Sequence, residues 1–350
     1  MSVCSPTDRY DDRRATFLCR PAARADLPRV RTRRASTPRP RAALDGAQLE
    51  VIAIHIVNDY HIARRRLAPE AVLVTGCSSG IGRATALALA RAGFPVWASA
   101  RHTAHLCELK QAGCRVVELD VTDEQSRITA VRKVEAEHGS VSVLINNAGR
   151  GGGGPVEEVA LDLVREIFGT NVFGLIRMCQ LVLPGMRAQR SGMIVNLGSA
   201  AGLVTPPTGC PYAMTKYALE SLCDALRLEV ASFGIEVALI EPGAVRTEFL
   251  ANSERHNPED DDDGPYAVFK ANVEKMIVRA DRDGARGVLT ADDVAKVILT
   301  AVTARRPKAR YKVGPQARLA PVARHLLGDR GWDAFMRRMV PFPPAITPSR

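Results

Sequence analysis

The stretch VLVTGCSSGIGRATALALARAG, residues Val72–Gly93, decides the fold that the sequence predicts. In it, a short apolar run leads into Gly76, Gly80 and Gly82, and an alanine-rich segment with helical periodicity follows. Each glycine costs a helix interior about 1 kcal/mol relative to alanine, so helix stability does not explain them. Glycine suits a backbone that needs positive φ or that a neighbour approaches closely. The stretch therefore predicts a tight strand-to-helix turn with a close neighbour against its backbone.

The same strand-then-helix alternation continues to about residue 315. Apolar runs of strand length occur at 71–76, 95–100, 115–121, 141–149, 192–200, 235–243 and 309–314. Segments with helical periodicity lie between them at 80–92, 102–112, 123–138, 161–188, 211–232 and 290–304. The last of these helices has Thr290 as its expected N-cap. Continuously apolar strands separated by helices are typical of a parallel sheet buried on both faces. We therefore predict an α/β fold, a single doubly wound (Rossmann-type) parallel sheet with helices on both faces.

Three segments depart from this alternation and divide the chain. Residues 1–67 hold 14 arginines, no lysine and seven acidic residues, and are expected to be a disordered extension. A targeting leader, a basic interaction arm and a leader translated from a misplaced start codon all remain open for it. Residues 249–285, which contain NPEDDDDGP, are expected to form an irregular lid over the active site of the catalytic domain, 68–315. Residues 316–350 are expected to form a helical tail.

Composition excludes several classes of protein. Residues 1–67 contribute +7 of the net charge of +10, so the folded part is nearly neutral and no nucleic acid partner is expected. No stretch reaches the roughly 18 uncharged apolar residues of a transmembrane segment. The eight cysteines form no CxxC pair and no zinc-type cluster with histidine, so we expect no metal site and a cytoplasmic location. The seven histidines form no catalytic set.

The predicted fold suggests what approaches the glycines. Ligands of doubly wound sheets bind at the carboxyl ends of the strands, where the free N–H groups of a helix attract anions. The close neighbour is therefore expected to be the pyrophosphate of a dinucleotide. The spacing G-x-x-x-G-x-G differs from the usual G-x-G-x-x-G, and either pattern alone is weak support.

Five motifs in order make the assignment specific. They are TGCSSGIG at 75–82, NNAG at 146–149, a serine at 199, YAMTK at 212–216 and EPGAVRT at 241–247. Over residues 70–315 the chain resembles the short-chain dehydrogenase/reductase family, and it is most similar to the hydroxysteroid and retinol dehydrogenase branch. The resemblance implies an NAD(P)-dependent oxidoreductase that acts on CH–OH groups.

Four residues are the expected catalytic set. Tyr212 and Lys216 are four positions apart, so they share a helix face. A neighbouring ammonium favours the phenolate and is expected to lower the tyrosine pKa from about 10. The resemblance implies that Tyr212 is the general acid or base, that Ser199 holds the substrate oxygen, and that Lys216 also binds the nicotinamide ribose. It further implies that Asn171 supports a water leading to Lys216, although a polar core residue that disturbs its helix is the plainer interpretation.

The resemblance also implies contacts for each part of the cofactor. Asp120 is expected to bond the adenine edge beside Val121, and Asn147 to stabilise the central sheet and flank the cofactor. Pro242 and its neighbours are expected at the nicotinamide carboxamide. The predicted cofactor-binding residues are Gly76, Ser78, Ser79, Gly80, Ile81, Gly82, Arg101, Asp120, Val121, Asn147, Ala148, Gly149, Tyr212, Lys216, Pro242, Gly243 and Thr247.

Cofactor choice depends on the end of the second strand. NAD enzymes of this fold place an acidic residue there for the ribose 2′-hydroxyl, whereas this chain has Ala100 and Arg101. A guanidinium suits a 2′-phosphate, and Ser79 could add a hydroxyl, so NADP(H) is expected to be preferred over NAD(H). The alternative is that Arg101 is a solvated surface residue.

The tail suggests a bulky substrate. The chain continues 36 residues beyond Gly314, with Leu319, Val322, Leu326, Trp332, Phe335, Met336 and Met339 at helical spacings. We expect this stripe to pack on the domain as core near the substrate pocket, rather than to attach the protein to a membrane. The tail is also expected to block tetramer packing, which would leave a monomer or homodimer. By resemblance the substrate is a bulky apolar secondary alcohol or ketone, steroid- or retinoid-like. A reductase of smaller or acyl-type ketones and a noncatalytic NADP(H) sensor are the alternatives.

Overall fold

The computed structural model describes residues 71–249, 264–281 and 287–340. The predicted extension 1–67 lies outside the described residues, as do parts of the predicted lid and the last ten residues of the tail.

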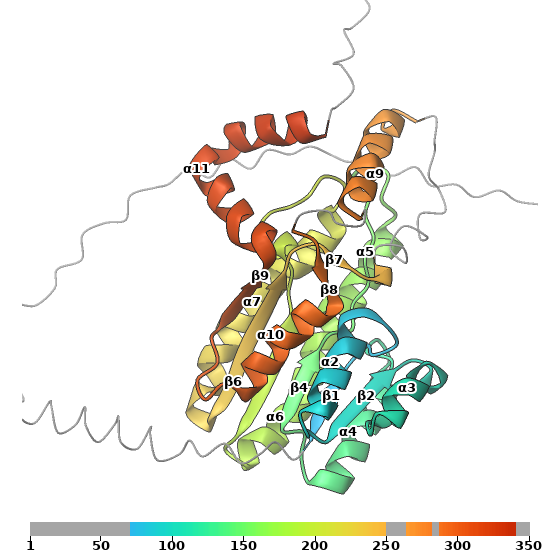
Figure 1. Ribbon diagram of the computed structural model, residues 1–350, viewed down its shortest axis with the longest axis vertical. Helices are drawn as coiled ribbons and strands as arrows, with labels where there is room; N and C mark the ends of the chain where they lie inside the picture. The colour runs from blue at the N-terminus through green and yellow to red at the C-terminus, as the bar shows by residue number, and fades with distance from the viewer. Residues whose placement is uncertain (1–70, 250–263, 282–286, 341–350) are drawn as a thin grey trace, which may run out of the picture. The chain divides into compact units, whose positions relative to one another are not determined.

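A seven-stranded sheet, parallel throughout, forms the centre of the fold (Figure 1). Its strand order is β3-β2-β1-β4-β5-β6-β9, so the order reverses between β1 and β4. The strands are β1 Val72–Val74, β2 Val96–Ala100, β3 Arg115–Glu118, β4 Val143–Asn146, β5 Gly192–Leu197, β6 Ile235–Pro242 and β9 Arg310–Val313. The doubly wound fold predicted from the alternation of strands and helices is confirmed, with each predicted strand present.

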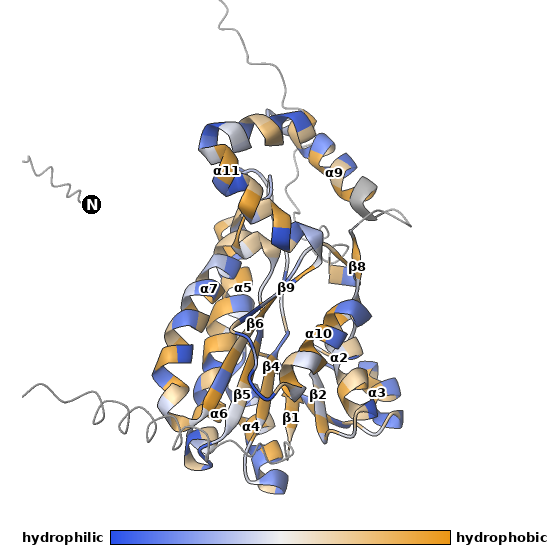
Figure 2. Cartoon of the chain, turned by 60° about the vertical axis from the view of Figure 1, so that its left-hand side comes forward, coloured by the Kyte–Doolittle hydropathy of each residue, from blue (hydrophilic) through white to orange (hydrophobic). Residues whose placement is uncertain are grey.

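Helices cover both faces of the sheet because successive strand residues point in opposite directions. Val72 and Val74 pack with α2 (Gly80–Arg91), α3 (Cys107–Gln111) and α10 (Ala291–Thr303). Leu73, between them, packs into a second core cluster with α4 (Glu124–His138), α6 (Leu175–Ala188) and α7 (Cys210–Val230). Apolar residues run along the strands between these two layers (Figure 2). The expected N-cap of α10 is confirmed, since Thr290 and Asp293 form a reciprocal capping box.

The helix predicted at 161–188 is interrupted in its middle. It consists of α5 (Leu161–Phe168), a π-helical segment (Gly169–Gly174) and α6. By length and composition alone, Leu161–Ala188 could cross a membrane, although the sequence analysis had found no such stretch. Its most apolar window is 44% buried in the protein, and α6 packs against the sheet. An amphipathic core helix can have the same length and composition as a membrane span, so this helix is weak evidence for one.

The predicted irregular lid contains a helix, so that part of the prediction is wrong. Helix α9 spans Ala267–Asp281, with Val273 buried and Lys270 in an ion pair with Glu158 at 3.2 Å. The acidic, turn-forming segment NPEDDDDGP predicts a loop, but the residues that follow it are helix formers. Two short strands, β7 (Val245–Arg246) and β8 (Leu289–Thr290), pair in parallel on either side of this insertion, and the sequence analysis had missed both.

The tail is helical, as predicted, but its apolar stripe is not core. Helix α11 (Gly314–Met339) has two arms that meet at Gly328, whose φ of 62° and ψ of 180° break the helix. Trp332 is buried, whereas five of the stripe residues are exposed, namely Leu319, Val322, Leu326, Phe335 and Met339. Because these five residues are exposed, core packing of the whole stripe is excluded.

Candidate active site

The glycines after β1 are required mainly by the protein's own packing. A Cβ on Gly82 would lie 2.2 Å from the Gly76 carbonyl oxygen and 2.3 Å from Asn147 Nδ2. Gly76 has a φ of +70°, and a Cβ there would meet Ala148 Cα at 2.8 Å. The close neighbour inferred from the sequence is therefore, at Gly76 and Gly82, the loop after β4 rather than a ligand.

Asn147 ties this loop to the glycine turn. Its Nδ2 donates to the carbonyl oxygens of Thr75 and Gly76, both at 2.9 Å. Thr75 Oγ1 accepts in return from the backbone N–H groups of Asn147 and Ala148, at 3.0 and 2.9 Å. The sequence analysis overlooked Thr75. Asn147 thus joins the ends of the neighbouring strands β1 and β4, and its neighbour Asn146 adds a bond to β5 by donating to Asn196 at 2.9 Å.

The amino end of α2 suits a pyrophosphate. Ser79, the N-cap, makes no side-chain hydrogen bond to the first turn. Gly76, Ser78, Ser79, Gly80 and Ile81 all line the pocket that begins at this turn. Uncapped N–H groups and the helix dipole favour an anion at such a position. The residues present therefore fit the phosphates of a dinucleotide.

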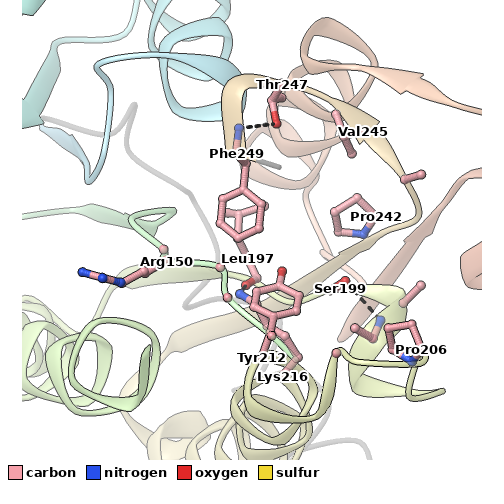
Figure 3. Close-up of a pocket in the computed structure, with 18 of the residues that line it drawn as sticks. Arg150, Leu197, Ser199, Pro206, Tyr212, Lys216, Pro242, Val245, Thr247 and Phe249 are labelled. Carbon is pink, nitrogen blue, oxygen red and sulfur yellow. Dashed lines mark hydrogen bonds between the residues drawn. The ribbon is translucent and has the colours of Figure 1, made fainter. Parts of the chain in front are cut away.

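Ser199, Tyr212 and Lys216 meet at the floor of the same pocket (Figure 3). Ser199 follows β5 and accepts from the backbone N–H of Ala201 at 3.1 Å, while Tyr212 and Lys216 come from successive turns of α7. Lys216 Nζ lies 5.4 Å from the centre of the Tyr212 ring and donates to the Leu197 carbonyl at 2.7 Å. The structure thus brings together three of the four expected catalytic residues.

Burial governs the proton affinities of this group. It raises the pKa of Tyr212 to about 12, although a hydrogen bond from Ser199 opposes the rise. Burial also lowers the pKa of Lys216 to about 8, because the ammonium loses its hydration. The sequence analysis expected Lys216 to lower the pKa of Tyr212, but in the protein alone this pKa is raised. Desolvation outweighs their stabilisation of the phenolate.

Asn171 lies in the π-helical segment and holds the loop after β4. Its Oδ1 accepts from the Arg150 N–H at 2.8 Å. Its Nδ2 donates to the Arg150 carbonyl at 2.9 Å and to Thr215 Oγ1 at 3.1 Å. Thr215 in turn donates to the Tyr212 carbonyl at 2.7 Å. Asn171 thus connects the glycine-rich loop to the turn of α7 that carries Tyr212, and it disturbs its helix as the plainer interpretation predicted.

The far end of the pocket presents a carboxylate beside an arginine. Asp120 Oδ1 accepts from the Thr122 N–H at 2.8 Å and from its hydroxyl at 2.7 Å. Although burial opposes it, these bonds and the charge of Arg101 lower the pKa of Asp120. Arg101, Asp120 and Val121 all line the pocket, where the sequence analysis had placed them.

The segment after β6 forms the opposite wall. Pro242, Gly243 and Thr247 line the pocket. A Cβ on Gly243 would meet Gln316 Oε1 at 2.4 Å, and the same oxygen accepts from the Ala244 N–H at 2.7 Å. Gln316 of α11, not predicted from the sequence, therefore fixes this wall.

The pocket is large and partly apolar. Its volume is about 1860 Å³, well above the roughly 300–1,000 Å³ of a typical small-molecule site. Beyond Tyr212 its lining becomes mainly apolar, with Val204, Pro206, Phe249, Val273, Ile277, Trp332 and Met336. The Phe249 ring lies 5.5 Å from the Tyr212 ring, centre to centre. The pocket therefore has room for a dinucleotide and an apolar substrate together.

A glycine run also contributes to this wall. Gly151–Gly154 lines the pocket, and the Gly154 N–H donates to the Thr208 carbonyl at 2.7 Å. A Cβ on Gly153 would lie 2.3 Å from that same oxygen. The sequence analysis assigned these glycines no role, but their repetition was the available signal. Phe249 and Trp332 had no such local signal for a place in the pocket.

Two carboxyl groups, one fully buried and one partly buried, lie together where α7 covers the end of β6. Glu241, at the end of β6, is fully buried, and neither of its carboxyl oxygens has a hydrogen-bond partner among the described residues. Burial and the proximity of Glu220 on α7 raise the pKa of Glu241 to about 7. Glu220 accepts from Arg310 Nε at 2.9 Å through its other oxygen. A proton on Glu241 would therefore be accepted by Glu220.

No metal site accompanies these groups in the described part of the chain. None of its clusters of histidine, cysteine, aspartate and glutamate could hold an ion.

Comparison with known proteins settles the family. A family model described as short chain dehydrogenase matches residues 70–258. This chain is a member of the short-chain dehydrogenase family. The predicted resemblance is confirmed, and with it an NAD(P)-dependent oxidoreductase that acts on alcohol or ketone groups.

Three similar proteins illustrate the range of the short-chain dehydrogenases around this one. A 3-ketodihydrosphingosine reductase of Bacteroides thetaiotaomicron is 35% identical, over 71% of this chain and 89% of the relative. Estradiol 17-beta-dehydrogenase 1 of Rattus norvegicus is 35% identical, over 77% and 80%. A short chain dehydrogenase/reductase from Burkholderia phymatum, solved in complex with NAD, is 28% identical, with a TM-score of 0.63 over 79% of this chain and 98% of that one.

Proposed function

We propose that this short-chain dehydrogenase transfers hydride between NADP(H) and a bulky apolar secondary alcohol or ketone, with Tyr212 as the acid and base. The observation that carries the proposal is the place of Tyr212. It lies where the glycine-turn end of the pocket meets the apolar end, with Ser199 and Lys216 beside it. A substrate oxygen at that junction is within reach of both hydroxyl groups.

The chain's own residues would handle the proton and the orientation. When bound, the nicotinamide supplies or accepts the hydride. In reduction, Ser199 and Tyr212 donate hydrogen bonds to the carbonyl oxygen of the substrate. In reduction, Tyr212 passes its proton to that oxygen, and in oxidation it takes the proton back. Lys216, held by the Leu197 carbonyl, keeps a positive charge near the phenolate, and Asn171 holds the turn that positions Tyr212.

The preference for NADP(H) rests on Arg101. Ala100 offers no carboxylate for a 2′-hydroxyl, and the exposed Arg101 follows it at the pocket rim. A guanidinium can bind two phosphate oxygens at once. The Burkholderia phymatum relative was solved with NAD, so the fold alone does not decide between the two cofactors. We therefore assign the preference to Ala100 and Arg101 at the edge of this pocket.

The apolar end of the pocket supports a bulky substrate. Aromatic and aliphatic side chains from α9 and α11 close it, and a small ketone would leave much of that surface in contact with water. The names of two relatives, a 3-ketodihydrosphingosine reductase and an estradiol dehydrogenase, refer to large, largely apolar molecules. We place the substrate in the same chemical class.

Absorbance of the reduced nicotinamide provides the test. Purified protein is mixed with NADPH and a graded series of ketones, from acetone through decalone to steroid and retinoid carbonyls. We expect kcat/KM to rise with apolar size. A flat or opposite trend, or turnover confined to acyl thioesters, would overturn the substrate class. Absence of turnover with every carbonyl and alcohol, despite tight NADPH binding, would favour a noncatalytic sensor instead.

A further inference from the structure

We propose that the outward side of α11 docks on an anionic lipid bilayer. The first arm carries Leu319, Val322 and Leu326, which are 65%, 54% and 78% exposed. Their spacing of three and four residues places them on one face of the helix. A contiguous exposed apolar stripe of this kind marks an interaction surface rather than ordinary scatter.

The second arm of α11 adds two partly exposed apolar residues and most of the arginines. Phe335 and Met339, one helical turn apart, are about half exposed. Hydrophobic and hydrophilic residues alternate along both arms (Figure 2). Helix α11 holds five arginines against two aspartates, which gives it a net charge of +3. The arginines are Arg318, Arg324, Arg330, Arg337 and Arg338.

The positive charge of α11 favours an anionic surface as its partner over a second copy of this chain. A two-fold contact between copies of this chain through α11 would bring two surfaces of charge +3 together. Anionic headgroups instead complement the arginines, while the apolar stripe enters the boundary with the acyl chains. An arginine-rich helix of low overall hydrophobicity, with Leu319, Val322 and Leu326 exposed on one face, has the composition of a segment that lies in the membrane interface.

The inner side of the same helix lines the pocket. Ala320, Trp332 and Met336 contribute to its wall, while Leu319, Val322 and Leu326 of the first arm are exposed and lie outside its lining. An apolar ketone dissolved in the bilayer would therefore meet the pocket wall at the docked helix. This route for the substrate rests on the proposed function, but docking itself does not.

Cosedimentation of the full chain with lipid vesicles tests the proposal. One set of vesicles is phosphatidylcholine alone, and the other is equal parts phosphatidylcholine and phosphatidylserine. The test variant carries Leu319→Ser, Val322→Ser and Leu326→Ser. The matched control carries Val156→Ser, Leu161→Ser and Leu228→Ser, which are comparably exposed residues elsewhere on the surface. We expect wild type and control to bind the anionic vesicles, and the test variant to bind at least tenfold less tightly.

A second variant, the salt dependence of binding and the sedimentation mass distinguish lipid docking from self-association. Arg330→Gln, Arg337→Gln and Arg338→Gln together should weaken binding and its salt dependence. Binding that survives the stripe variant would assign it to another part of the chain and overturn the proposal, as would equal loss in the control. A stripe variant that keeps vesicle binding but changes the sedimentation mass would assign the stripe to a second copy. Vesicle binding is read without turnover, so failure of the proposed function would not mimic these results.

Discussion

Lys216 Nζ lies 5.4 Å from the centre of the Tyr212 ring, and burial shifts the two pKa values in opposite directions. The tyrosine is held as a neutral phenol, while the lysine loses part of its preference for the charged form. In the proposed oxidation direction, where Tyr212 must accept a proton as phenolate, additional positive charge or a hydrogen-bond donor is therefore expected to be needed at the site. Oxidised nicotinamide carries such a charge, so proton transfer is expected to be coupled to cofactor binding.

Tyr212→Phe removes the proposed proton carrier and little else. Because a positioned acid–base group contributes about 10²-fold or more, kcat should fall at least that far. NADPH affinity, measured by fluorescence titration, should stay close to wild type. Tyr217→Phe, an exposed tyrosine on the same helix, is the control and should leave kcat unchanged. A Tyr212→Phe enzyme with more than about a tenth of wild-type kcat would refute the role.

Arg101→Leu should affect one cofactor and spare the other. A charged hydrogen bond contributes about 1.5–3 kcal/mol, and about 1.4 kcal/mol is a tenfold change. kcat/KM for NADPH should therefore fall roughly ten- to a hundredfold, while the value for NADH hardly changes. Adding Ala100→Asp should reverse the preference, because a carboxylate repels the phosphate. Arg305→Leu, an exposed arginine outside the pocket lining, is the control. Equal or better use of NADH by the wild type would return Arg101 to a solvated surface residue.

Gly82→Ala tests whether the glycine is needed for packing within the protein or for contact with the cofactor. Its new Cβ would overlap the Gly76 carbonyl and Asn147 Nδ2, so α2 must shift. Overpacking of this kind costs about 1–3 kcal/mol, and Tm should fall even without cofactor. Gly169→Ala is a matched control, because a Cβ there meets nothing within 4 Å. If Gly82→Ala kept the wild-type Tm and lost only cofactor affinity, the turn would be shaped for the ligand after all.

The buried carboxyl pair predicts a loss of stability toward high pH. The pKa of Glu241 is raised from its usual 4.5 to about 7, chiefly by burial and then by Glu220, while Lys312 and Arg310 oppose the rise. The folded state therefore holds a proton that the unfolded chain has released. The extra stability is complete below about pH 4.5 and declines as pH rises to about 7.

Urea unfolding between pH 4.5 and 8 measures this slope. Glu241→Gln keeps a donor toward Glu220 that does not titrate, so the decline should become shallower. Glu229→Gln, exposed on the same helix as Glu220, should leave the slope as in wild type. An unchanged slope in Glu241→Gln would mean that the pair does not share a proton.

The sequence was sufficient wherever the signal was local and periodic. The apolar strand runs and the capping residue Thr290 each gave the right element. The order of the motifs placed Tyr212, Ser199 and Arg101 around one pocket, because parallel strands end at a common edge. Motif order therefore predicted which side chains share a pocket, and the roles assigned to them stay predictions.

The sequence was insufficient where tertiary context decides. Whether Leu319 and Val322 are core or surface depends on which face of α11 packs against the domain, and a helical period cannot distinguish the two. The direction of the Tyr212 pKa depends on how deeply its hydroxyl is buried, which spacing does not report. Helix α9 was missed because its acidic neighbours at 259–263 dominated the interpretation of the whole insertion.

Trp332 gives the protein an optical reporter of its own pocket. The chain has two tryptophans, and the other, Trp97, is buried in the core beneath α4. Indole emission overlaps the absorption band of a reduced nicotinamide, so filling the pocket should quench the fluorescence of Trp332 more than that of Trp97. Binding of the cofactor in the pocket should thus be measurable in stopped flow without any attached dye, and Trp332→Phe would supply the blank.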